Sequence, residues 1–224
     1  MSYLDRPEPE VDGGVTSGLH MDPLVITSIT PVPPSKTTHP LRPDFRIPFD
    51  GDVDDARVQR VLKAVNAQVA MGYKVIILDI NSNGGDVDAG LDFIRALDDV
   101  RARDVHVTCV VHRAQSMAGF ILEGVCDTRL ILDYGRIMFH HAHAGGVERN
   151  ADQMENLAVE LRVLDSALAA RVLKRLRITK KEYYQRIYLH DWFMDAQEAL
   201  AVGAVDKIIP DVSHLPPLLV LPAE

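Results

Sequence analysis

The chain has 224 residues, of which 47% are hydrophobic and 25% charged, and its formal net charge is −8 at pH 7. These values are typical of a globular domain with a sizeable core, and the negative charge disfavours binding to nucleic acid or to an anionic membrane. No run of about 18 apolar residues could span a membrane, and the first residues lack the pattern of a secretory signal. We therefore expect a cytoplasmic protein with a neutral or peptidic partner.

The cysteine content is low. Cys109 and Cys126 both lie among apolar residues. Two cysteines are too few for a disulfide framework, and a thiol in such surroundings usually packs as a small hydrophobic side chain. The sequence therefore predicts buried thiols and a reducing compartment.

The proline-rich N-terminal segment differs from the rest of the chain. Residues 1–43 lack any sustained helical or alternating pattern, which predicts a flexible arm or leader. We expect the folded domain at 44–212 and a C-terminal tail at 213–224.

The folded part opens with alternating strand and helix patterns. Residues 45–49 indicate a short strand, 54–72 an amphipathic helix and 74–80 an apolar strand. This order is typical of a βαβ unit in a largely parallel sheet. The predicted fold class is therefore α/β.

The same alternation continues along the chain. The pattern predicts a helix at 87–100, a buried strand at 105–111, a short apolar helix at 117–124, and strands at 129–133 and 136–140. The regular switching supports one continuous domain.

A long helix is predicted at about 151–177. Its apolar residues follow heptad spacing: Met154, Leu157, Leu161, Leu164 and Leu168. So apolar a helix needs a packing partner. A short helix closed by Gly203 and a terminal strand complete the predicted elements.

A glycine turn, NSNGGDVDAG, follows the strand at 74–80. It could present backbone N–H groups to an anion, or only allow a tight turn. The G-x-G-x-x-G of a dinucleotide site is missing, as is the Lys with Ser or Thr of a phosphate loop. We therefore predict no cofactor.

Ser116 lies between an apolar strand and a short helix, in HRAQSMAGF. At such a corner a hydroxyl can act as a nucleophile, with the N–H of Met117 beside it to stabilise an oxyanion. An isolated serine at a helix start is far more often an N-cap. Whether Ser116 is a nucleophile or an N-cap therefore depends on which other catalytic residues the sequence contains.

A histidine follows at the end of a later strand. His140, in RIMFHHAHAGG, is a suitable base for a hydroxyl nucleophile. His141 and His143 share one face of an extended strand, but no carboxylate or cysteine ligand follows at a recognisable zinc-site spacing. We predict no metal and expect both to face solvent or line a pocket.

Together these segments resemble the ClpP family of serine peptidases over about residues 45–210. NSNGGDVDAG is similar to the family's N-S-P-G-G-x-V-x-x-G loop, AQSMAGF to its A-A-S-M segment and RIMFHHAHAGG to R-x-M-I-H-Q-P-x-G-G. HDWFMDAQEALAVGAVDKII is similar to R-D-x-F-M-S-A-x-E-A-x-x-Y-G-L-I-D-x-I. Four motifs in the same order make the resemblance specific.

The resemblance implies a catalytic triad. Ser116 would be the nucleophile, His140 the general base and Asp191 the acid that orients the histidine. An acid before an aromatic pair is otherwise a surface or capping residue, so only the resemblance singles out Asp191.

The resemblance also implies the remaining architecture of the site and fold. Backbone N–H groups of Gly85 and Met117 would form the oxyanion hole, and Gly84 and Gly85 would contact the substrate. The expected fold is a ClpP/crotonase-like spiral of βαβ units with a protruding handle helix. The expected assembly is a homo-oligomeric ring, either a heptamer or a stacked double ring.

Some positions depart from the family pattern. Asn83 replaces a proline, Gln115 an alanine, and His141-Ala142 a Gln-Pro pair. Ile77 and Asp79 stand where many family members have tyrosines that line the docking pocket for an AAA+ unfoldase. The resemblance implies such a partner, but these substitutions argue against standard docking.

The leading functional hypothesis is a serine endopeptidase that cleaves unfolded proteins or peptides through an acyl-enzyme inside an oligomeric chamber. One alternative is a catalytically idle ClpP-like scaffold or regulatory subunit, although no triad member is missing. Another is a crotonase-type enzyme acting on CoA thioesters, which shares the fold but needs no Ser-His-Asp set. A divergent or phage-type protease that matures capsid proteins also fits the sequence.

Overall fold

A six-stranded sheet organises the part of the chain that the computed structural model describes, residues 44–143 and 150–221. The arm predicted at 1–43 lies outside these residues. The strands are β1 (Ile47–Asp50), β2 (Val75–Ser82), β3 (His106–Gln115), β4 (Thr128–Phe139), β5 (Trp192–Met194) and β6 (Lys207–Ile209).

Most strand pairs in this sheet are parallel. The strands follow the order β1-β2-β3-β4-β5, in which the first four are mutually parallel and β5 is antiparallel to β4. β6 runs parallel to β4 and pairs with its first half, whereas β5 pairs with its second half. The predicted α/β class with a largely parallel sheet is confirmed.

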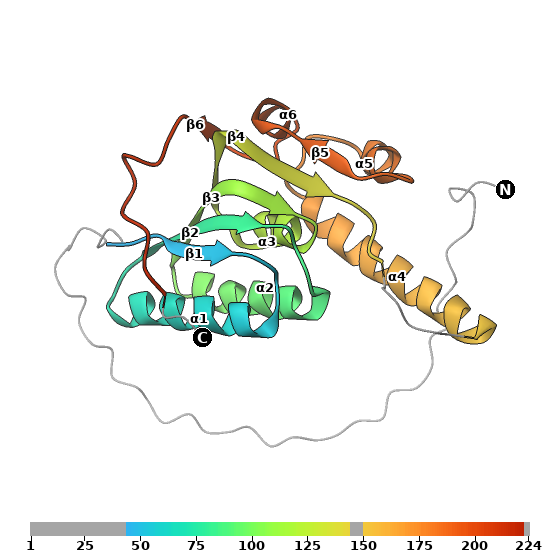
Figure 1. The fold of residues 1–224 in the computed structure, drawn as a ribbon, viewed down its shortest axis with the longest axis horizontal. Helices are drawn as coiled ribbons and strands as arrows, with labels where there is room; N and C mark the ends of the chain where they lie inside the picture. Colours follow the sequence, from blue (N-terminus) through green and yellow to red (C-terminus); the bar gives the residue numbers. More distant parts are fainter. Residues whose placement is uncertain (1–43, 144–149, 222–224) are drawn as a thin grey trace, which may run out of the picture. The chain divides into compact units, whose positions relative to one another are not determined.

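Helices connect the strands. They are α1 (Asp55–Ala70), α2 (Val87–Arg101), α3 (Met117–Val125), α4 (Ala151–Val172), α5 (Lys180–Ile187) and α6 (Ala196–Ala201). Asp54 caps α1 and Asp86 caps α2 by accepting backbone hydrogen bonds. Figure 1 shows α1 and α2 together on one side of the sheet, whereas α4 extends away from it. No helix in the described residues is both long and apolar enough to span a membrane.

Two sequence predictions about β4 and its neighbours need correction. The strands predicted at 129–133 and 136–140 are one continuous strand that passes through Gly135. A Cβ atom at Gly135 would lie 2.5 Å from the Ile131 side chain and 2.8 Å from the Val111 carbonyl oxygen. The glycine therefore permits close strand approach instead of ending the strand. The sequence also failed to indicate α5 and β5.

The long helix α4 ends at Val172, five residues before the predicted end at 177. Beyond it, the Arg175 guanidinium donates to the Cys126 carbonyl oxygen at 2.7 Å, and the Arg177 N–H donates to the Val202 carbonyl oxygen at 2.7 Å. These tertiary hydrogen bonds direct the chain away from the helix axis.

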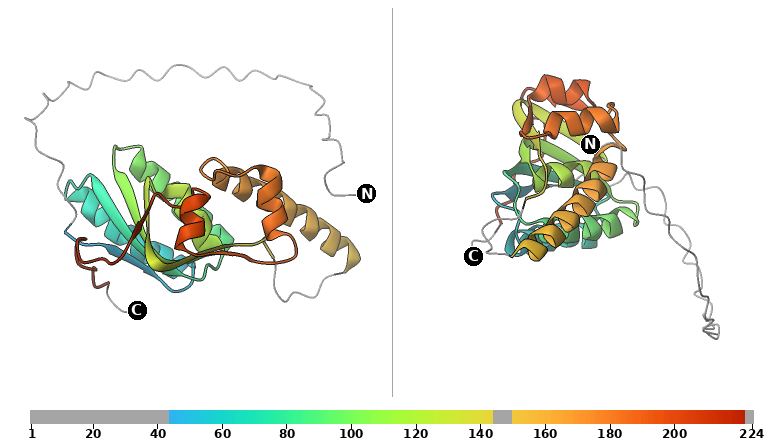
Figure 2. Two further views of the ribbon diagram at one scale, coloured as in Figure 1. Left: turned by 90° about the horizontal axis from the view of Figure 1, so that it is seen from above. Right: turned by 90° about the vertical axis from the view of Figure 1, so that its right-hand side faces the viewer.

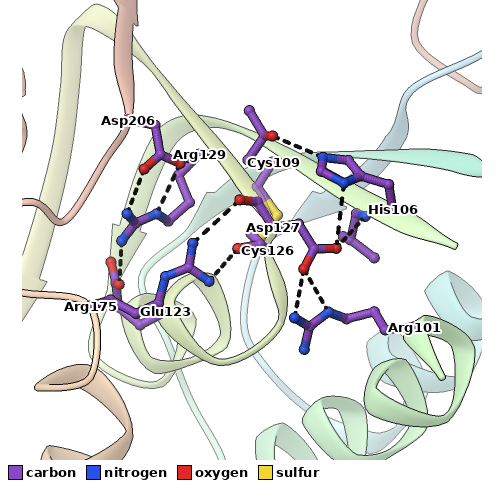
Figure 3. The surroundings of a disulfide bond; sticks show 11 residues. Arg101, His106, Cys109, Glu123, Cys126, Asp127, Arg129, Arg175 and Asp206 are labelled. Carbon is purple, nitrogen blue, oxygen red and sulfur yellow. Dashed lines mark hydrogen bonds and ion pairs between the residues drawn. A yellow bond between two sulfur atoms is a disulfide. The ribbon is translucent and has the colours of Figure 1, made fainter. Parts of the chain in front are cut away.

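The prediction that Cys109 and Cys126 are free thiols is wrong. Cys109 of β3 and Cys126, which follows α3, form a disulfide with their Cα atoms 5.7 Å apart (Figure 3). The helix returns along β3 and brings residues 17 positions apart into contact, which the local sequence does not reveal. Both side chains are fully buried, as predicted. Cysteine usage nevertheless gives no support for a reducing compartment.

A network of acidic and basic side chains lies near this disulfide (Figure 3); Glu123 and Arg129 are buried and Asp206 is exposed. Arg129 bridges Glu123 of α3, at 2.6 Å, and Asp206, at 2.7 Å. Burial raises the pKa of Glu123 to about 8, although Arg129 and Arg175 oppose the shift. The network joins α3 to the segment before β6.

The C-terminal residues lie beside the start of β1. The Arg46 N–H donates to the Pro217 carbonyl oxygen, and the Leu219 N–H donates to the Arg46 carbonyl oxygen, both at 2.8 Å. The described part of the predicted tail at 213–224 is therefore hydrogen-bonded to the domain. The described residues from Asp44 onward belong to one compact unit.

Candidate active site

Three candidate segments meet at the carboxyl ends of neighbouring parallel strands. The glycine turn follows β2, Ser116 follows β3 and His140 follows β4. Ser82 pairs with Ala114, and Gln115 pairs with Met138, so the three strand ends adjoin. This edge is where open α/β sheets usually bind ligands.

Ser116 has an unusual backbone conformation, with φ of 51° and ψ of −125°. Positive φ is uncommon for a residue other than glycine and often occurs at functional sites. The residue precedes α3, but its side chain makes no capping hydrogen bond. Its Oγ lies 2.7 Å from His140 Nε2 instead. The hydroxyl is therefore directed at the histidine and not at the helix.

The glycine turn packs against this serine corner. Gly84 has a φ of 96°, and a Cβ atom there would lie 2.6 Å from the Gln115 carbonyl oxygen and 2.9 Å from the Met117 nitrogen. Gly85 has a φ of 151°, and its Cβ would lie 2.4 Å from the Val53 carbonyl oxygen. Both conformation and space therefore require glycine at these two positions.

The predicted oxyanion donors belong to these adjoining segments. Val53 donates to the Gly84 carbonyl oxygen and accepts from the Asp86 N–H, and no acceptor for the Gly85 N–H lies among the described residues. Met117 is the first residue of α3, and such N–H groups lack an acceptor within the helix. Both groups are thus candidates for binding a negatively charged oxygen.

His140 contacts two groups through its two ring nitrogens. Its Nδ1 lies 2.5 Å from the carbonyl oxygen of His141, and its Nε2 contacts Ser116 Oγ. Because a carbonyl can only accept, the contact assigns the proton to Nδ1. Nε2 is then free to accept the serine proton.

Asp191 lies close to His140 but is not hydrogen-bonded to it in the described structure. Antiparallel pairing of Trp192 with Phe139 brings the preceding Asp191 beside the following His140. Both residues line a pocket of about 340 Å³, together with His143. Asp191 is thus near enough to be considered, but its role stays a prediction.

Comparison with known proteins defines the family. The Clp protease family model matches residues 36–212. The chain belongs to the Clp protease family. It is 34% identical over 145 residues to the ATP-dependent Clp protease proteolytic subunit 2 of Prochlorococcus marinus (strain NATL2A), covering 63% of this chain and 70% of the relative. It is 35% identical over 138 residues to subunit 3 of Synechococcus sp. (strain CC9902), covering 61% and 67%. The predicted resemblance is confirmed.

One departure from the Clp family pattern has a clear structural consequence. Ala142, which replaces a proline, donates its N–H to Asp165 Oδ1 of α4 at 2.7 Å. Asp165 Oδ2 lies 2.8 Å from His141 Nδ1, and the His141 ring stacks on Tyr184. The sequence motifs do not indicate Asp165, because its contact depends on how α4 passes residues 141 and 142.

His143, the third histidine of the segment that begins at His140, lies beside His140. The His143 ring centroid lies 4.8 Å from that of His140, so His143 lines the pocket, one of the two locations expected for it. No group of three potential ligands that could hold a metal ion occurs in residues 44–143 and 150–221.

Proposed function

We propose that the chain is a serine endopeptidase that cleaves unfolded polypeptides through an acyl-enzyme. The observation that carries this proposal is the 2.7 Å contact between Ser116 Oγ and His140 Nε2 at a strained strand-to-helix corner. Membership of the Clp protease family supports the same chemistry. A crotonase-type activity would not need this serine–histidine pair.

The geometry supports a mechanism of acyl transfer. His140 Nε2 accepts the Ser116 proton while Oγ attacks the carbonyl carbon of the scissile peptide bond. The N–H groups of Gly85 and Met117 would stabilise the resulting oxyanion. His140 then donates the proton to the leaving amine, and a water activated by the same imidazole hydrolyses the ester. Asp191, as the resemblance implies, would stabilise the imidazolium.

Labelling with a fluorophosphonate probe, followed by peptide mapping, tests the nucleophile. The wild-type protein should be labelled on Ser116, and Ser116→Ala should abolish both labelling and peptide hydrolysis with little change in thermal stability. Ser213→Ala is a suitable control because Ser213 is exposed and distant in sequence from the motif. An unlabelled wild-type protein would favour the idle scaffold, and labelling that persists in Ser116→Ala would refute the assignment.

We further propose that the protein works as a ring in which α4 contacts another subunit. Met154, Val159 and Val163 are 53%, 52% and 66% exposed, an unusual amount of apolar surface for one helix. The left view in Figure 2 shows α4 extending from the body of the domain. A second copy of this helix would cover the apolar residues.

Charge substitution on α4 tests the assembly. Val159→Glu combined with Val163→Glu should dissociate the oligomer and reduce peptidase activity, as measured by sedimentation velocity alongside a peptide assay. Arg162→Glu changes an exposed polar residue on the same helix and should retain assembly. A wild-type protein that sediments as an active monomer at micromolar concentration would contradict the ring and its chamber.

An AAA+ unfoldase is a proposed partner, because both relatives are described as ATP-dependent proteolytic subunits. Asp79 is buried and contacts Arg46, also buried, at 3.3 Å and His112 at 2.9 Å. At this position a partner would therefore meet the partly exposed His112 and the exposed Tyr134, whose hydroxyl lies 3.2 Å from His112 Nδ1. A cytoplasmic location remains part of the proposal without support from the cysteines.

A further inference from the structure

The peptide unit between His141 and Ala142 is hydrogen-bonded on both sides. Its carbonyl oxygen lies 2.5 Å from His140 Nδ1, and its N–H donates to Asp165 Oδ1 at 2.7 Å. A continuous series of hydrogen bonds thus runs from a carboxylate, through one peptide unit and one imidazole, to Ser116 Oγ.

This arrangement affects the histidine in two ways. A peptide whose N–H is bonded to a carboxylate is polarised, which makes its carbonyl oxygen a stronger acceptor. The same bond also fixes the orientation of the peptide plane. The carbonyl therefore holds the proton on His140 Nδ1 and leaves Nε2 unprotonated to receive the serine proton.

Asp165 is itself held firmly enough to do this. Its side chain is only 16% exposed, and its second oxygen contacts His141 Nδ1 at 2.8 Å. Both carboxylate oxygens therefore engage neighbouring residues, His141 and Ala142, that directly follow the histidine.

The arrangement depends on an N–H group at position 142. Proline occupies this position in the family segment that the sequence resembles, and proline has no N–H to donate. The alanine in this chain supplies the donor. The contact is therefore a consequence of this chain's own substitution.

We propose that Asp165 is a positioning residue that holds His140 in the Nδ1–H tautomer through the His141–Ala142 peptide. This inference rests on the proposed peptidase function. It also connects catalysis with α4, because the helix that carries Asp165 exposes apolar residues suited to a subunit contact.

The test compares steady-state peptide hydrolysis by three α4 variants. Asp165→Ala should lower kcat by about tenfold or more, because a charge-assisted hydrogen bond to the peptide is lost, while KM stays nearly unchanged. Asp165→Asn keeps an acceptor for the Ala142 N–H and should recover part of that loss. Glu160→Ala removes an exposed acid from the same helix and should leave kcat and KM unchanged.

Sedimentation velocity on each variant separates positioning from assembly. We expect both Asp165 variants to sediment like the wild type, so that the fall in kcat does not follow dissociation. A kcat for Asp165→Ala within twofold of the wild type would overturn the inference. So would a loss that appears only with dissociation, or an equal loss in Asp165→Asn and Asp165→Ala.

Two further variants separate this inference from the proposed function. Ser116→Ala should abolish hydrolysis; hydrolysis that does not depend on Ser116 would refute the proposed function and this inference together. Asp191→Asn should lower kcat, because the imidazolium would lose its stabilising carboxylate, and Asp165→Ala should lower kcat independently of Asp191. A large loss in Asp191→Asn with normal turnover in Asp165→Ala would assign the orienting role to Asp191.

Discussion

Helices α3 and α4 differ sharply in how they are packed. All but one of the nine residues of α3 are buried, including Glu123, whereas α4 has 22 residues and buries only Leu168, Ala169 and Val172, all near its end. The helix that follows Ser116 is therefore packed almost entirely within its own domain. Most of the helix that carries Asp165 is not, which is the basis for the proposal that a second subunit covers its exposed apolar residues.

This difference separates two kinds of constraint. Around α3, added atoms that press against the backbone of the Ser116 corner should alter the position of Ser116, because close-packed neighbours cannot relax far. Along the exposed part of α4, changes in side-chain volume should alter association more than folding. Substitutions in the two regions should thus have separable effects.

The largest effect is expected at the turn that contacts the start of α3. Gly84→Ala would force a side chain into positive φ and against two backbone atoms, so the turn or the Ser116 corner must move. Peptidase activity should fall by about 100-fold or more. Stability in urea should fall by about 2 kcal/mol.

Gly124→Ala, within α3, provides the control for this prediction. Its new Cβ would lie 3.2 Å from Ile94 Cδ1, 3.3 Å from Ile94 Cγ1 and 3.4 Å from Arg171 Nη1, which are side-chain atoms and not backbone, and alanine favours the helix. We expect near-normal activity from this control. Normal activity in Gly84→Ala would show that the site is less tightly packed than described.

A pair of truncations compares the two helices directly. Leu122 in α3 is completely buried, so Leu122→Ala should lower the free energy of unfolding by about 2–5 kcal/mol. Val163→Ala in α4 should change the monomer's free energy by less than about 0.5 kcal/mol, because the side chain is exposed. Urea unfolding at several protein concentrations would measure both; equal losses would remove the distinction between the helices.

A smaller effect is expected from the buried acid of α3. With a pKa raised from 4.5 to about 8, Glu123 keeps its proton in the folded protein at pH values where the unfolded chain releases it. Its contribution to stability therefore decreases as pH rises through this window. Relative to Glu123→Gln, the wild type should lose about 1 kcal/mol between pH 6 and pH 7. If the free energies of unfolding of the wild type and Glu123→Gln changed equally with pH, the raised pKa of Glu123 would be contradicted.

Local sequence patterns predicted most elements that lead to Ser116. The apolar strand β3 and helix α3 have clear periodicity, and their order defines the corner between them. The sequence did not indicate β5, because three residues form a strand only through pairing with the end of β4. The sequence pattern also predicts two strands where β4 is one, because a glycine such as Gly135 in a short apolar run is typical of a turn.

In the candidate site, too, the residues within local motifs can be predicted from the sequence, whereas the contacts made by tertiary packing cannot. The motifs indicate Ser116 and His140, and the structure places their side chains in contact. The sequence does not indicate Asp165, because its neighbourhood is that of any polar position on an amphipathic helix. Its contact with Ala142 depends on tertiary packing over 23 residues. The disulfide was missed for the same reason.

The Cys109–Cys126 disulfide joins β3 to the end of α3, the helix that begins after Ser116, and both cysteine side chains are fully buried. A thiol reductant can reach it only during a local opening of α3 or its neighbours. The rate of reduction in the folded protein therefore reports how often α3 or the segments packed around it open. The disulfide thus provides a chemical probe of local opening around the helix that begins after Ser116.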